Sequence, residues 1–166
     1  MSSAPSGPST ADLEALAGYA AVLADGIERS IGPWVERSVE IVCEKSGVMV
    51  TGKLRQQART AGAEATAEIA PRVRALLALD IDEQRLGPLE LLRSAVRWPT
   101  QVLRDLGVAA ASRDESAKAM FPDDDYDLTP ASFGDLDPAL HEPGLVWGAA
   151  KAHVFLARRR AAGQLS

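Results

Sequence analysis

The sequence predicts an all-α fold: a single-domain bundle of five to seven helices, with proline bends and a long acidic loop before the C-terminal helix. Alanine and leucine dominate its apolar residues, and only 5% of the chain is aromatic. Such residues favour helices, whereas strands favour β-branched and aromatic side chains. Apolar residues also recur at spacings of three and four, as on one face of a helix. The length of 166 residues is typical of about one domain.

The first helices are expected to follow a flexible leader rich in serine and proline, residues 1–9. Thr10 is a suitable capping residue, and the segment after it carries one apolar stripe. Gly32 and Pro33 are expected to end this helix, with Pro33 placed in the first turn of a second one. The second helix should end at Ser46.

A long alanine-rich helix is expected from about Val50 to Leu79. Pro71 should kink it or split it, because proline lacks a backbone donor and clashes with the preceding turn. The next helix should open at Pro88 and bend at Pro99, and a weak helix is expected near residues 114–120.

The last helix is expected to start at Pro143 and to end in three arginines, residues 158–160. Residues 163–166 would then be a short tail, so that residues 10–162 form one helical domain. Between the body and this helix lies a proline-rich acidic loop, residues 121–142, which we expect to pack across the C-terminal helix.

Composition disfavours several classes of function. A net charge of −5 and a pI near 5.1 argue against nucleic-acid binding, which needs clustered basic residues. The single cysteine, Cys43, excludes an internal disulfide and is expected to be a small core residue. The N-terminus lacks the features of a signal peptide, and no run reaches the roughly 18 apolar residues of a membrane span. We therefore expect a cytoplasmic protein with no membrane partner.

Charge is concentrated near the C-terminus. Residues 112–142 contain nine acidic and two basic residues, whereas residues 143–166 contain four basic residues and no acidic one. The loop carboxylates could therefore fold back onto arginines 158–160. They could also form a patch that docks a protein partner, with an aromatic ring as its anchor. The residues expected in this patch are Asp123, Asp124, Asp125, Tyr126 and Asp127.

Two short patterns resemble known sites without completing them. Gly47 to Lys53 has the spacing of a phosphate-binding loop, but Leu54 replaces the metal-binding hydroxyl and helices are expected on both sides. A turn between two helices is the preferred interpretation. Asp123, Asp125 and Asp127 alternate as in a calcium loop, but the glycine and glutamate of an EF-hand are absent from the matching positions, so we assign no metal site.

The aromatic and basic side chains around the expected bend at Pro99 could instead line a ligand pocket between helices. Tryptophans most often staple helices together, but Trp98 could instead line a pocket, with neighbouring arginines as clamps for an anion. The two histidines could share a metal or perform acid–base work, although a core role is favoured for His153. The residues assigned to this pocket are Arg93, Arg97, Trp98, Phe121, His141, Trp147 and His153.

These observations predict a non-enzymatic interaction or regulatory protein. It would dock a partner through the acidic loop and adjoining helices, and it would self-associate through a helix face. The alternative is a helical bundle that binds a small molecule near Trp98, Pro99 and Trp147, with catalysis left open. The sequence assigns no catalytic residue, no cofactor and no identified partner.

Overall fold

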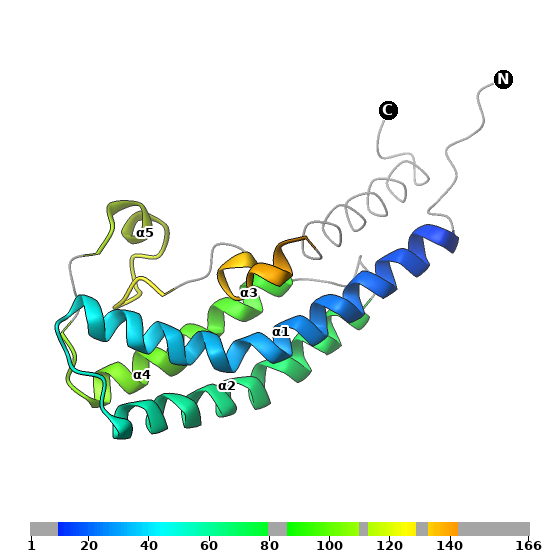
Figure 1. The fold of residues 1–166 in the computed structure, drawn as a ribbon. Coiled ribbons are helices and arrows are strands. Elements are labelled where there is room, and N and C mark those ends of the chain that lie inside the picture. The colour runs from blue at the N-terminus through cyan, green and yellow to red at the C-terminus, as the bar shows by residue number, and fades with distance from the viewer. Residues whose placement is uncertain (1–9, 80–85, 110–112, 129–132, 143–166) are drawn as a thin grey trace.

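The computed structural model describes residues 10–79, 86–109, 113–128 and 133–142. These residues form α-helices, short 3-10 turns and connecting segments, and no strand occurs among them, which confirms the prediction of an all-α fold (Figure 1). The expected leader, tail and C-terminal helix lie outside the described residues. No helix in the described ranges is long and apolar enough to cross a membrane.

Helix α1 (Thr10–Lys45) is continuous, so the break predicted at Gly32 and Pro33 is wrong. A proline normally disfavours the helical conformation of the residue before it, because the ring collides with that residue's Cβ. Gly32 has no Cβ. Pro33 also lies on the exposed side of the helix, where the carbonyl that it leaves without a partner faces solvent.

Helix α2 (Gly52–Ala78) begins where Thr51 caps it, its hydroxyl oxygen accepting the Leu54 amide at 3.2 Å. Pro71 lies inside this helix and does not split it; its side chain is exposed. The turn from α1 uses Gly47 at a φ of +68°, and the Val48 amide donates to the Cys43 carbonyl at 2.8 Å. Glycine is favoured at this left-handed position, which ends the helix.

The third long segment is less regular than predicted. Helix α3 (Pro88–Arg93) continues through a 3-10 turn, η2 (Ser94–Val96), into helix α4 (Arg97–Asp105). The irregular turn thus precedes Pro99 instead of coinciding with it. Pro99 cannot donate to the carbonyl four residues earlier, that of Ala95, and its ring crowds that carbonyl. The distortion therefore falls in the preceding turn.

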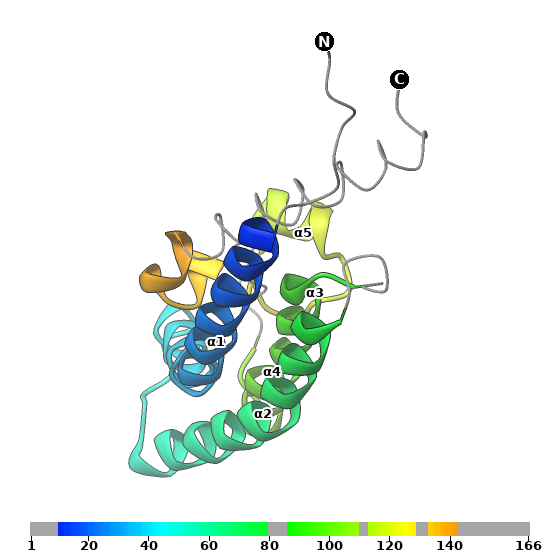
Figure 2. The same cartoon turned by 90° about the vertical axis from the view of Figure 1, so that its right-hand side faces the viewer.

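Helices α1 and α2 form an antiparallel pair, and the α3–α4 segment packs along both (Figures 1 and 2). The pair approaches most closely at two glycines, since a Cβ placed on Gly62 would lie 3.0 Å from the Gly32 backbone. Cys43 is buried, as predicted. The fully buried side chains that centre this core include Leu23, Ile27, Ile31, Val35, Val39, Ile69, Val73, Leu92 and Leu103.

Short elements complete the described part. Helix α5 (Glu115–Met120) matches the weak helix that was predicted, with Asp114 as its cap. Two 3-10 turns, η3 (Phe133–Asp135) and η4 (Pro138–Leu140), lie on α1. We call residues 133–140 the strap. The Asp137 carboxylate caps η4 by accepting the Ala139 amide at 2.9 Å, as expected of an Asp-Pro start.

The strap is fixed to α1 by hydrogen bonds from Ser30 and Arg37 and by a buried leucine; Ser30 donates to the Asp137 carboxylate at 3.3 Å. Arg37 donates to the carbonyls of Asp135 and Leu136 at 3.1 and 3.0 Å. Leu140 is buried over Gly26, where a Cβ on the glycine would lie 2.1 Å from the leucine side chain. The strap, which is the second described part of the acidic loop, therefore packs on α1; the C-terminal helix on which the loop was expected lies outside the described residues.

Candidate functional site

The acidic cluster, residues 123–127, lies against the end of α4. Tyr126, at 5% exposure, donates its hydroxyl to the Val108 carbonyl at 2.7 Å. Burial raises the pKa of this hydroxyl above its ordinary value. In this conformation the ring expected to anchor a partner is part of the core, together with Leu128.

Arginines of the same chain engage the carboxylates of this cluster. Asp124 pairs with Arg93 at 3.4 Å, and Asp125 accepts the Nε of Arg104 at 2.6 Å. Arg93, assigned to the predicted ligand pocket, thus pairs with the acidic loop instead. Arginines 158–160 lie outside the described residues.

Asp127 has the most complete set of partners. Its two oxygens accept the Arg113 guanidinium at 2.7 Å and the Asp114 backbone amide at 2.9 Å. Partial burial pushes its pKa upward, but these hydrogen bonds and the arginine charge together outweigh burial and lower the pKa below the ordinary value. This carboxylate therefore holds the loop to the start of α5.

The residues predicted to line one pocket lie in several places. The Arg93 guanidinium lies 4.1 Å from the centre of the Phe121 ring, beside the acidic cluster. Arg97 lies 4.2 Å from the centre of the Trp98 ring and pairs with Glu68 at 2.7 Å.

Pro99 is fully buried in the core, and His141 is exposed at the end of η4. Trp147 and His153 lie outside the described residues. Of the described residues assigned to the predicted pocket, Trp98 does line a pocket.

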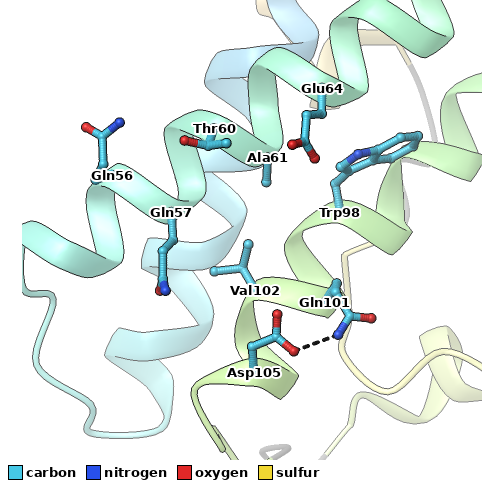
Figure 3. Close-up of a pocket in the computed structure, with 9 residues that line it drawn as sticks. All are labelled: Gln56, Gln57, Thr60, Ala61, Glu64, Trp98, Gln101, Val102 and Asp105. Carbon is cyan, nitrogen blue, oxygen red and sulfur yellow. Dashed lines mark hydrogen bonds between the residues drawn. The ribbon is translucent and has the colours of Figure 1, made fainter.

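That pocket lies between α2 and α4 and has a volume of about 310 Å³ (Figure 3). Trp98 and Glu64 lie toward one end of it, and Gln57 and Asp105 toward the other. Gln101 donates to the Asp105 carboxylate at 2.7 Å. The lining residues are Gln56, Gln57, Thr60, Ala61, Glu64, Trp98, Gln101, Val102 and Asp105.

Gln57 contributes a side-chain oxygen that is buried and accepts no hydrogen bond within the described structure. Buried polar atoms nearly always have a partner, so this oxygen is available to accept a hydrogen bond from a bound molecule. The Thr100 hydroxyl oxygen is in the same state, but Thr100 does not line the pocket.

Sequence reasoning missed most of this lining. Gln57, Thr60 and Glu64 follow one another at spacings of three and four, as do Trp98, Gln101 and Asp105. Each set is a polar stripe beside the apolar stripe of its helix, a pattern typical of a surface face. The two stripes face each other across the pocket because α4 packs against α2, which the sequence pattern does not indicate.

Two other cavities offer less for a ligand: one of about 70 Å³ is small, and its glutamates Glu36 and Glu40 are paired with Arg59 and Arg55. A second pocket of about 330 Å³, between α1 and α2, is lined by alanines, Leu77 and Arg74. Arg74 is already held by Asp25 and Glu28. No group of histidine, cysteine, aspartate and glutamate side chains in the described ranges is arranged to hold a metal. The segment from Gly47 to Lys53 is a turn between two helices, as preferred over a phosphate-binding loop.

Comparisons of this chain with protein-family models, curated proteins and solved structures found no significant match.

Proposed function

We propose that this chain is a small-molecule-binding helical bundle and that its ligand occupies the pocket between α2 and α4. The buried, unpartnered oxygen of Gln57 in that pocket carries the proposal. A volume of about 310 Å³ suits a small ligand, and the lining combines three apolar or aromatic side chains with six polar ones. Such sites commonly lie between the helices of a bundle.

Docking of a partner through the acidic loop is the less favoured function. Asp124, Asp125 and Asp127 are each paired with an arginine of their own chain, and Tyr126 is buried. A partner would have to displace these contacts before it could use the side chains.

A substitution that fills the pocket tests the proposal. Thr60 lines the pocket and is exposed, so Thr60→Phe should block the space without disturbing the core. Ala67→Phe, on the same helix and outside the pocket lining, is the control. Thermal unfolding would be measured with a panel of amines, alcohols and carboxylates, because a ligand that binds the native state raises the melting temperature.

We expect at least one class in the panel to stabilise the parent chain and the Ala67→Phe variant but not the Thr60→Phe variant. The proposal is contradicted if no compound raises the melting temperature of the parent chain, or if a compound stabilises the Thr60→Phe variant as well.

A further inference from the structure

The pocket between α2 and α4 is lined by two acidic side chains, and the nearby Arg97 pairs with a third carboxylate outside the lining. Glu64 and Asp105 line it, and its lining includes no basic side chain. The other carboxylate on these two helices, that of Glu68 one turn beyond Glu64, is held by Arg97 at 2.7 Å. In the part of the chain that the structure describes, neither Glu64 nor Asp105 forms an ion pair. A cationic ligand would complement this pocket.

The two carboxylates lie toward opposite ends of the pocket. Because α2 and α4 run antiparallel, Glu64 is on the side of Trp98, and Asp105 is on the side of Gln57 (Figure 3). Seven residues separate the two pocket residues on each helix, from Gln57 to Glu64 and from Trp98 to Asp105. Seven residues are about two helical turns, or roughly 10 Å along the axis. The pocket is therefore elongated, with a negative charge near each end.

The groups between and beside these charges differ in character. Ala61 and Val102 form an apolar stretch between the ends. At the Asp105 end, the buried Gln57 oxygen is a second acceptor for an N–H donor. At the Glu64 end lies the Trp98 ring, which the Arg97 guanidinium contacts at 4.2 Å. Each end thus has one carboxylate, the Asp105 end has a further acceptor, and a surface for methylene groups lies between them.

From this arrangement we infer that the ligand is a linear aliphatic dication, with an amino group at each end of a hydrocarbon chain. One ammonium group binds Glu64; the other binds Asp105 and the Gln57 oxygen. This inference rests on the proposed function, because it names the ligand class of the same pocket.

A length series tests the inference. Isothermal titration calorimetry would compare 1,4-diaminobutane, 1,6-diaminohexane and 1,8-diaminooctane with 1-aminohexane and 1,6-hexanediol. The diamines should bind with an optimum of chain length, because both ends must reach their carboxylates together. Removing one ammonium group should weaken binding about tenfold or more, the usual effect of losing a charged hydrogen bond.

Two substitutions test whether each carboxylate binds an ammonium group of the ligand. Glu64→Gln and Asp105→Asn should each reduce the affinity for the best diamine about tenfold. Both side chains are on the surface, so the variants should keep the parent's melting temperature without ligand. Glu44→Gln removes an exposed carboxylate of α1 outside the pocket lining and should leave the affinity unchanged.

The outcomes separate the two claims. One outcome is that the diol or a dicarboxylate binds the parent chain but not the Thr60→Phe variant, while the diamines bind neither. In that case the pocket function stands and the dication is overturned. Equal affinities for diamine and monoamine, or diamine binding that ignores both substitutions, also overturn it. If no amine, alcohol or carboxylate binds, the proposed function itself fails.

Discussion

The contact between α1 and α2 at Gly62 predicts a measurable loss of stability on replacement by alanine. A Cβ at Gly62 would lie 3.0 Å from both the Cα and the carbonyl oxygen of Gly32. Carbon atoms in contact prefer about 3.5–4.0 Å. Because the opposing atoms are backbone, neither can rotate away, so the two helices must separate locally. Forcing extra volume into a packed contact of this kind costs about 1–3 kcal/mol.

The same substitution at Gly18 is the matched control. Gly18 lies in α1, and a Cβ there would meet nothing within 4 Å. Replacing glycine by alanine inside a helix stabilises by up to about 1 kcal/mol, partly by restricting the unfolded chain. That gain applies to both variants, so the difference between them approximates the steric penalty at Gly62 alone.

Thermal unfolding followed by circular dichroism would measure this difference. A change of 1 kcal/mol shifts the melting temperature of a domain of this size by roughly 2–4 °C. The Gly62→Ala variant should therefore melt at least about 2 °C below the Gly18→Ala variant. Equal melting temperatures would refute the argument that the helices meet at backbone contact there.

Two further predictions concern the strap and the acidic cluster. Gly26→Ala should displace Leu140 and destabilise the chain by about 1–3 kcal/mol, because the new Cβ would lie 2.1 Å from the leucine side chain. In a double-mutant cycle measured by urea unfolding, Gly26→Ala with Leu140→Ala should cost less than the sum of the single changes; additivity would contradict the contact. Since the native pKa of Asp127 is lowered, its stabilising effect should be complete above the ordinary value of 3.8 and be lost as pH falls through the native pKa. In urea unfolding, the Asp127→Asn variant should accordingly have a lower free energy of unfolding than the parent at pH 7, and this difference should disappear in strong acid. A difference independent of pH would count against the role assigned to this carboxylate.

Helix type and approximate extent could be predicted from the sequence because both depend on local periodicity. The effect of each proline could not, because it depends on which side of the helix the ring lies and on the residue before it. Pro33 follows a glycine and is exposed, so α1 continues; Pro99 is buried and displaces the irregular turn into residues 94–96. The periodic pattern alone does not distinguish these two cases.

The candidate site was predictable only at Trp98. The aromatic and proline residues near the bend indicated a pocket, but its opposite wall comes from α2, some 40 residues earlier in the chain. Gln57 and Glu64 are ordinary surface residues in sequence terms, and the approach of α4 gives them a shared cavity. Pairings such as Arg104 with Asp125 likewise depend on tertiary placement.

The way in which the strap is attached also determines which part of the molecule opens first. The strap residue Leu136 accepts a hydrogen bond from Arg37, which is 99 residues away in sequence. Helices α1 and α2, in contrast, are joined by a short turn. The strap meets α1 through a few side chains, such as Arg37 and Leu140, whereas α1 and α2 pack along many turns. The strap should therefore detach before the helical pair separates, so that its backbone amides exchange with deuterium through a local opening. The slowest-exchanging amides would then be those of α1 and α2 around the Gly32 and Gly62 contact.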